Sequence, residues 1–494
     1  MTPPPNSDLG GAWRRLTLGL IVASLVCAGA FAAAALDEES RTARPVPEAQ
    51  CGPGSRPETD IQGRVPKADY RSGRAARGYL CNTRQVGHYG KSGGFKTLRY
   101  VDRQGRVCAY YDSDPIAPHD ILGGVLADGL GVVALDMSDP SRPRRTANLM
   151  TPAMIAPHES LLVHQRRGLL VAVMGTAATA PGFVDVYDVK DDCRHPKLLS
   201  TFPSVLFGHE SGLSPDGRTF WAAGAAGGNL TALDISDPRR PRIVFNKTGV
   251  VYHGLRFSAD GRTMYVANIG TPGAEGILSG GGLHIYDVSE VHERAPEPKV
   301  RKLSELTWPE VSIPQSAEPF TVDGHQYVLE VDEFIDLFTF ESLGRFRTAP
   351  VGAARIIDVD DPRNPEIVSD IRLQVHQPAR RTDEVLDDPG NVSPAQGYAA
   401  HYCSVPRRRD PGLAACSMIL SGLRVFDIRD PEHPREVAYF NRPKLPGLAL
   451  TPEVGSYAMS RPTWDVENRQ VWYTDVHTGF YAVRLTNGVG RLLR

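Results

Sequence analysis

A short apolar phrase that recurs along the chain limits its fold more than any other feature. In each full copy, large apolar residues alternate with small ones and the run ends in an aspartate, as in GVVALDMSDPSRP (131–143) and NLTALDISDPRRP (229–241). The alternation is typical of a half-buried β-strand. The strand is expected to turn at its end, because Asp side chains bond nearby backbone amides and Pro cannot continue the ladder. The aspartates that end the six full copies are Asp136, Asp188, Asp234, Asp287, Asp358 and Asp427.

The spacing of these copies predicts a propeller. Successive aspartates lie 46 to 71 residues apart, and a seventh copy, GFYAVRL (479–485), has Arg484 in place of the aspartate. Such periods are typical of four-stranded propeller blades, the longer ones carrying insertions. Strand–turn–strand segments such as HESGLSPDGRTFWAAG (209–224) stand between the copies and suit the inner hairpin of a blade. We predict an all-β fold, a seven-bladed β-propeller of four-stranded blades.

The propeller is predicted to span 81–494 and to be closed by an N-terminal strand. Few residues follow the seventh copy, so its blade lacks an ordinary fourth strand. We expect a segment near 81–90 to supply that strand, because closure of the ring removes exposed strand edges. Residues 37–80 are polar, rich in Pro, Gly and Arg, and without apolar periodicity, and we interpret them as a linker.

The first 36 residues have the form of a targeting segment. Arg14 and Arg15 precede an apolar run over 16–36, which ends in the small residues of 32–35. This pattern indicates a secretory signal peptide, and the alternative is an uncleaved single-span anchor, which would be the chain's one membrane contact. Both readings predict a secreted or cell-surface protein with its body outside the cytoplasm.

The cysteines and the charge agree with export. Six cysteines follow the N-terminal segment, an even number that predicts three disulfides in an oxidising compartment. We predict the pair Cys403–Cys416, because both residues are expected on one hairpin, and the pairing of the other four stays open. The absence of a CxxC spacing argues against a structural zinc site. A net charge of −2 without a basic stripe gives no support for a nucleic-acid partner.

The repeated phrase resembles the LVIVD-repeat family of bacterial propellers, which is named for an apolar strand motif of this kind. The resemblance covers about 120–485 and departs from the pattern at DVKDDCRHP (188–196) and at GFYAVRL (479–485). It implies a propeller at the cell surface or outside the cell. It implies no catalytic residues.

Histidines at equivalent places suggest a metal site. His209 and His253 each lie eight residues before a turn glycine, and other side chains hold similar even offsets, which puts them on one strand face. Glu159 and Glu210 lie beside two of these histidines. Imidazoles bind Zn, Cu, Fe or Ni, and carboxylates orient them, so one transition-metal ion is the candidate cofactor. The predicted metal ligands are His158, His209, His253, His401 and Glu318.

Two functions remain open at this stage. The first is an exported propeller that binds a small-molecule or protein partner at its central-channel face without catalysis. The alternative is a metal-dependent enzyme, for example an oxidoreductase, with the histidine cluster at the channel mouth; a purely structural envelope component is a third possibility. Adjacent residues such as His158 and Glu159 are expected to face opposite sides of a strand, so they form no ready-made triad. The acidic run VLEVDEFID (328–336) is interpreted as a solvated insertion, or as a cation site or part of the channel rim.

Overall fold

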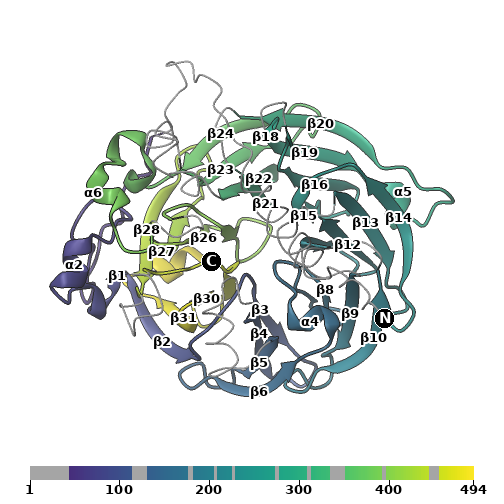
Figure 1. Ribbon diagram of the computed structural model, residues 1–494, viewed down its shortest axis with the longest axis horizontal. Helices are drawn as coiled ribbons and strands as arrows, with labels where there is room; N and C mark the ends of the chain where they lie inside the picture. Colours follow the sequence, from purple (N-terminus) through teal and green to yellow (C-terminus); the bar gives the residue numbers. More distant parts are fainter. Residues whose placement is uncertain are drawn as a thin grey trace, which may run out of the picture.

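Seven antiparallel sheets, six of four strands and one with an added fifth, form a β-propeller in the computed structural model (Figure 1). The structure describes residues 44–113, 131–175, 182–204, 208–224, 228–272, 278–308, 313–333, 351–391, 397–443 and 455–493. The predicted signal or anchor segment, 1–36, lies outside these ranges. Within them, no helix has the length and apolar character needed to cross a membrane.

The first four sheets follow one another along the chain, each from its inner to its outer strand. Their strands are β3 (Thr97–Val101), β4 (Val107–Asp112), β5 (Val132–Asp136) and β6 (Arg144–Leu149); β7 (Leu162–His164), β8 (Leu169–Val173), β9 (Phe183–Asp188) and β10 (Lys197–Pro203); β11 (Glu210–Leu213), β12 (Thr219–Gly224), β13 (Asn229–Asp234) and β14 (Arg242–Thr248); and β15 (Tyr252–Phe257), β16 (Thr263–Asn268), β19 (Gly282–Asp287) and β20 (Arg301–Thr307).

The remaining three sheets complete the ring. Their strands are β21 (Ile313–Val322), β22 (His325–Glu333), β23 (Ala354–Asp358) and β24 (Glu366–Ile371); β25 (Tyr402–Ser404), β26 (Leu413–Met418), β27 (Gly422–Asp427) and β28 (Arg435–Asn441); and β29 (Thr463–Asp465), β30 (Gln470–Asp475), β31 (Gly479–Leu485) and β2 (Thr83–Tyr89). A small hairpin of β17 (Thr271–Pro272) and β18 (Leu278–Ser279) extends from the fourth sheet.

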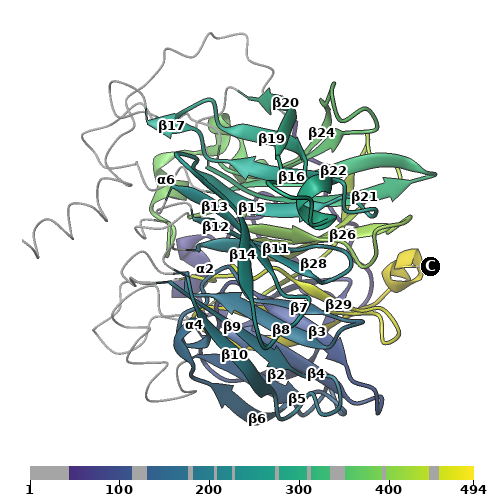
Figure 2. The ribbon, with the colours of Figure 1, turned by 90° about the vertical axis from the view of Figure 1, so that its right-hand side faces the viewer.

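Helices are few and short. They are the α-helices α2 (Lys67–Arg71), α4 (Pro152–Ile155), α5 (Ser289–His292) and α6 (Asp383–Leu386), and the 3-10 helices η1 (Ala75–Arg77), η5 (Gln374–His376), η6 (Pro378–Arg380) and η7 (Val489–Leu493). Figure 2 shows α4 on one face of the ring and the C-terminal end of the chain on the other. The candidate site described below lies on the α4 face.

The recurring phrase forms the third strand of each sheet, and its aspartate holds the turn that follows. Asp136 Oδ1 accepts a hydrogen bond of 3.0 Å from the backbone amide of Ser138, and its Oδ2 lies 3.1 Å from the Arg144 guanidinium at the start of the outer strand. Asp234 makes the same contacts with Ser236 and Arg242. All six aspartates accept a bond from the backbone amide two residues on, and Asp427, like Asp136 and Asp234, also pairs with an arginine of the outer strand.

Two N-terminal strands pair with the C-terminal part of the chain. β2 is the outer strand of the seventh sheet, where Thr83 lies opposite Leu485 and Tyr89 opposite Phe480. β1 (Tyr79–Cys81) adds a fifth strand to the sixth sheet, beside β28. An N-terminal strand is thus the outermost strand of both the sixth and the seventh sheets.

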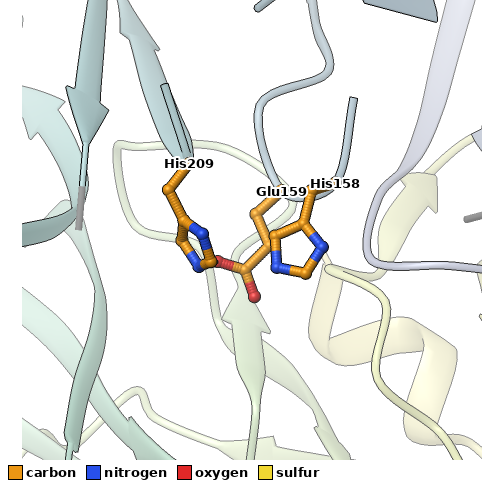
Figure 3. Close-up of side chains that lie close together, drawn as sticks. All are labelled: His158, Glu159 and His209. Carbon is orange, nitrogen blue, oxygen red and sulfur yellow. The ribbon is translucent and has the colours of Figure 1, made fainter. Parts of the chain in front are cut away.

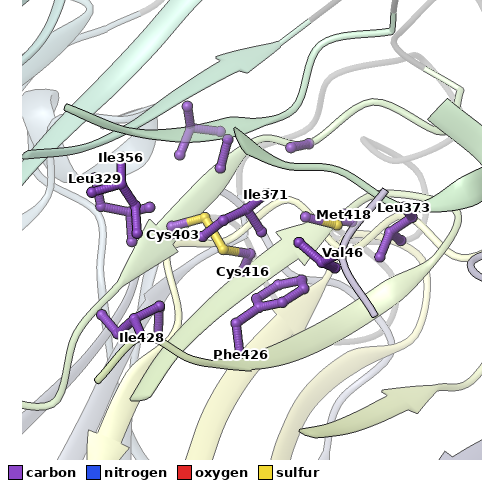
Figure 4. Packing of buried hydrophobic residues seen from close by; sticks show 14 of the residues in the cluster. Val46, Leu329, Ile356, Ile371, Leu373, Cys403, Cys416, Met418, Phe426 and Ile428 are labelled. Carbon is purple, nitrogen blue, oxygen red and sulfur yellow. A yellow bond between two sulfur atoms is a disulfide. The ribbon is translucent and has the colours of Figure 1, made fainter. Parts of the chain in front are cut away.

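Apolar side chains fill the spaces between neighbouring sheets. Figure 4 shows the cluster between the fifth and sixth sheets, where Leu329 and Ile356 pack near Phe426 and the Cys403–Cys416 disulfide. A cluster between the seventh and first sheets joins Trp472 to Tyr111. Burial of this surface between blades is the main force that holds such a ring together.

The six cysteines of the described chain form three disulfides, which is typical of an oxidising, extracytoplasmic environment. Cys403–Cys416 joins β25 to β26, at the pair that the sequence predicted. The two pairs that the sequence left open are Cys51–Cys81 and Cys108–Cys193. Cys51–Cys81 fastens the segment before β1 to the sixth sheet, and Cys108–Cys193 joins the first blade to the second.

Residues 44–78, most of the segment interpreted as a polar linker, pack against the sixth blade. The buried Arg424 guanidinium of β27 lies between the carboxylates of Glu58 and Glu436. Arg64 Nε lies 2.8 Å from Asp388 Oδ2. Figure 1 shows α2 beside β1 at the outer edge of the ring. Buried ion pairs, the Cys51–Cys81 disulfide and scattered apolar side chains hold this segment, without the apolar periodicity of a strand.

Candidate metal centre

Four histidines and two glutamates from five consecutive blades converge at the α4 face of the ring. His158 and Glu159 stand between α4 and β7, His209 and His401 directly precede the inner strands β11 and β25, and His253 lies in β15. Glu333 is the last residue of β22. These positions are all at the same end of the inner part of the blades, which brings residues distant in sequence to one place. Figure 3 shows Glu159 lying between His158 and His209.

Glu159 is the centre of this group. Its Oε2 lies 3.3 Å from His209 Nε2 and 3.2 Å from His253 Nε2, and its Oε1 lies 3.0 Å from His401 Nε2. Glu333 Oε2 lies 3.1 Å from the same nitrogen of His401. His158 completes the group, because its ligand atom and those of Glu159 and His209 all lie within 4.8 Å of one another.

Two of the imidazoles are held in one tautomer by backbone carbonyls. His253 Nδ1 lies 3.0 Å from the carbonyl oxygen of Pro314, and His401 Nδ1 lies 2.6 Å from that of Met459. A carbonyl only accepts, so each Nδ1 carries the proton and donates it. In the neutral ring the lone pair is then on Nε2, which faces the carboxylates. This is how proteins orient histidines that bind metals.

Three of these atoms are buried without a hydrogen bond of suitable geometry among the described residues: Glu159 Oε2, His253 Nε2 and His401 Nε2. The side chains of Glu159, His253 and His401 are at most 3% exposed. Buried polar atoms are nearly always satisfied, because leaving one unsatisfied costs about 1–3 kcal/mol. Lone pairs from imidazoles and carboxylates that gather in a buried site fit a cation.

The charges at this site perturb one another strongly. Burial by itself raises the pKa of Glu159, but the imidazoles of His253, His209 and His401 outweigh it and hold the pKa well below its usual range. Burial lowers the pKa of His401, but Glu159 and Glu333 outweigh burial and raise the pKa to about 9. Burial, reinforced by His158, lowers the pKa of His209. Clustered shifts of this kind are typical of functional sites.

The backbone at His158 explains how two adjacent residues reach one site. The sequence predicted opposite directions for His158 and Glu159, on the assumption that both lie in a strand. His158 instead has φ of 51°, in the left-handed region, and lies outside the strands. A Cβ on Gly175 would lie 2.7 Å from His158 Cβ, so glycine there gives the loop its room. Phe95 covers the site, with ring centroids 4.2 Å from His158 and 5.4 Å from His401.

Glu318 lies away from the other predicted ligands. Its Oε2 is 3.0 Å from Arg461 Nη2 and 3.5 Å from Arg256 Nε, and the structure gives it no short contact with the histidines. The carboxylate that the fifth blade brings to the site is Glu333, at the far end of the neighbouring strand β22. A signal for Glu333 existed in the sequence, because it belongs to the acidic run over 328–336 for which a cation site was one interpretation.

The rest of the described acidic run lies in a buried ion network. Arg355 Nη1 is 2.5 Å from Glu330 Oε2, and Arg355 Nη2 is 2.7 Å from Asp332 Oδ2. Trp308 donates from Nε1 to Asp332 Oδ2 over 3.0 Å. Interpretation of the run as a solvated insertion was therefore wrong for Glu330, Asp332 and Glu333, because β22 continues through them into the ring. Asp336 lies outside the described residues.

A second charged cluster adjoins the site, and we call it the Lys96 cluster. The Lys96 ammonium pairs with the Glu210 carboxylate and lies 3.8 Å from the ring centroid of Tyr402, whose hydroxyl donates to Glu210 Oε1 over 3.1 Å. Arg256 Nη1 lies 3.5 Å from Glu210 Oε2. Burial lowers the pKa of Lys96 to about 8. Glu210 follows His209 and Tyr402 follows His401 in the sequence, so this cluster fixes the backbone next to two of the site's histidines.

The solved structures similar to this chain are distant from it in sequence. A scan against protein-family models finds no match, and a search of curated proteins finds no significant match. Among solved structures, Kuenenia stuttgartiensis hydrazine synthase is 11% identical with a TM-score of 0.48, over 81% of this chain and 97% of that chain. The Pseudomonas aeruginosa periplasmic gluconolactonase PpgL is 14% identical with a TM-score of 0.45, over 75% and 96%. The Myceliophteria thermophila Cps50 (Swd1) β-propeller domain is 11% identical with a TM-score of 0.47, over 81% and 98%.

Proposed function

We propose that this protein is an exported metalloenzyme that binds a transition-metal ion at the α4 face of its propeller. Of the two functions that the sequence left open, the contacts around Glu159 favour the metal-dependent one over binding without catalysis. The proposed ligands are His158, Glu159, His209, His253, Glu333 and His401.

The spacing of the ligand atoms carries the proposal. Nitrogen and oxygen ligands bind a Zn²⁺-like ion at about 2.1 Å, so two neighbouring ligands of one ion lie about 3.0–3.4 Å apart. The four shortest approaches in the site, between the Nε2 atoms and the oxygens of Glu159 and Glu333, measure 3.0, 3.1, 3.2 and 3.3 Å. These distances suit the edges of a coordination polyhedron around an ion, and the ligand types are those that Zn, Cu, Fe and Ni prefer.

Catalysis is favoured over a purely structural role for the metal. Structural metal sites hold together folds that cannot close by themselves. Here β2 pairs with β31 of the last sheet, and three disulfides link the chain. The His209 side chain is 22% exposed, which leaves one side of the site open to a substrate. A bound ion would supply Lewis-acid or redox chemistry there, and the residues of this chain would hold it and exclude bulk water.

Metal analysis tests the proposal directly. We expect the purified protein, after removal of metal with a chelator and reloading, to retain at least one transition-metal ion per chain, and the double variant His209→Ala/His253→Ala to retain less. The matched control is His195→Ala/His433→Ala, which alters two exposed histidines and should bind as the wild type does. Metal content can be measured by plasma mass spectrometry. A wild type that retains no more metal than the double variant would overturn the proposal.

The affinity for metal should depend on pH well above the usual histidine range. An imidazole must lose its proton before it binds a metal ion. Because the pKa of His401 is raised to about 9, protons compete for this ligand up to about that pH. We expect the apparent Zn²⁺ affinity to rise by about tenfold per pH unit and to level off near pH 9. Competition with a chromophoric chelator measures this, and an affinity that levels off near pH 6.5 would contradict it.

Export and family membership belong to the same proposal. We infer that the segment 1–36 directs the chain out of the cytoplasm, and the three disulfides support this. We also assign the chain to the LVIVD-repeat propellers, on the repeated phrase in its sequence. Mass spectrometry of the mature protein from its native host would reveal whether that segment is removed.

A further inference from the structure

We infer that the site holds two metal ions bridged by the Glu159 carboxylate. This inference rests on the proposed function, and it concerns how many ions the same residues take and what kind of substrate then fits.

The two oxygens of Glu159 face different partners. Oε2 lies 3.3 Å from His209 Nε2 and 3.2 Å from His253 Nε2, whereas Oε1 lies 3.0 Å from His401 Nε2. When a carboxylate binds a single ion, the other ligands of that ion all lie on the same side of the carboxylate. In Glu159, each oxygen instead has an imidazole nitrogen at the distance expected between two ligands of one ion. The carboxylate is therefore placed to bridge two ions.

The possible ligands separate into two sets that share only this residue. In one set, the ligand atoms of His158, Glu159 and His209 lie within 4.8 Å of one another, and in the other set those of Glu159, Glu333 and His401 do so. His253 stands beside both, with Nε2 3.2 Å from Glu159 Oε2 and 3.8 Å from Glu333 Oε1. Each set supplies three donors, and four in the set that His253 joins, which is enough for one ion with a position left for substrate.

The number of donors also favours two ions. Four imidazoles and two carboxylates exceed the four protein ligands of a closed tetrahedral site, and catalytic sites commonly use three. Paired ions in enzymes lie about 3.5–4 Å apart, a separation that one carboxylate spans with its two oxygens. A mononuclear site would leave part of this set without a ligand role, although Glu159, His253 and His401 are all buried.

Charge balance then indicates the substrate class. Two divalent ions bring four positive charges, and Glu159 and Glu333 supply two negative ones. The pair therefore requires an anionic oxygen ligand, either a hydroxide or a carboxylate or phosphate group of a substrate. Such a ligand would reach the ions from the side on which His209 is partly exposed.

The number of metal ions that the wild-type protein binds per chain distinguishes one ion from two without any variant. Titration of chelator-treated protein with Zn²⁺, followed by calorimetry and by metal analysis after desalting, should give about two ions per chain. One ion per chain would overturn the bridged pair and leave the proposed function standing. No retained ion would overturn both.

Two paired variants supply a second readout. His158→Ala/His209→Ala removes one set, and Glu333→Gln/His401→Ala removes the other, and each should lower the stoichiometry from two ions to one. Glu318→Gln, outside both sets, should leave two. In addition, wild-type protein loaded with Cu²⁺ should show an electron paramagnetic resonance spectrum broadened by coupling between the ions. Isolated-ion spectra at full loading would contradict the bridge. Circular dichroism of each variant checks that it has folded.

Discussion

Replacing Lys96 with methionine is expected to lower the free energy of unfolding by about 3 kcal/mol, because it leaves the Glu210 carboxylate buried without its main cation. Both side chains of this pair are 0% exposed. Removal of one member of a buried pair typically costs about 3–5 kcal/mol, and we expect the lower end because Arg256 Nη1 stays 3.5 Å from Glu210 Oε2. Methionine keeps the length of the side chain and its contact with Tyr402, so the effect reports the charge. Urea denaturation followed by circular dichroism measures it.

Two controls separate the charge from the packing. The double variant Lys96→Met/Glu210→Gln removes both charges and should recover part of the lost stability. Lys67→Met removes a surface cation that lies 2.7 Å from Asp387, and it should change stability by less than about 1 kcal/mol. If Lys96→Met costs no more than Lys67→Met, the Lys96–Glu210 contact does not stabilise the fold as we argue.

Replacing Arg424 with methionine is expected to cost about 3–5 kcal/mol and to loosen the segment 44–78. The guanidinium lies between the carboxylates of Glu58 and Glu436 and 4.6 Å from the ring centroid of Tyr439. Its side chain is 0% exposed. Without it, two carboxylates would face each other in a buried space. Glu58 would leave most easily, because it belongs to the N-terminal segment rather than to a blade.

Hydrogen exchange locates this effect along the chain. In Arg424→Met, amides of 44–78 should exchange faster than in the wild type, while those of β26 and β27 change less. Arg142→Met is the matched control, because its partner Asp139 is exposed and the pair should contribute little. An equal increase in exchange rate throughout the chain, or an unchanged rate in 44–78, would contradict a role for Arg424 in holding this segment. The Cys51–Cys81 disulfide stays in place in all these variants.

The blades could be predicted from the sequence because their signal is local. The apolar alternation and the terminal aspartate lie within about a dozen residues, and the bond from the aspartate to the backbone amide two residues on forms in all six full copies. The packing of 44–78 could not be predicted in this way. Glu58 and Arg424 are 366 positions apart, and nothing near Glu58 in the sequence indicates its partner.

The candidate site was predictable where it follows the repeat. His209 and His253 hold the same offset from a turn glycine, so equivalent blades carry them to the same face. Glu318 also had an even offset, but side chains along one strand lie at different depths, and Glu318 pairs with Arg461. The direction of Glu159 depends on the left-handed backbone of His158, which strand periodicity does not predict.

By itself, the sequence determined a ring of seven four-stranded blades, the disulfide between Cys403 and Cys416, and the set of histidines that the blades carry. Only the tertiary structure decided which carboxylates meet those histidines. It placed Glu159 and Glu333 among the imidazoles, whereas Glu318 pairs with arginines. It also packed the N-terminal segment on the sixth blade. The physical reason is range: turns and strands form from neighbouring residues, whereas a buried charge takes its partner from whatever the closed ring brings within a few ångströms.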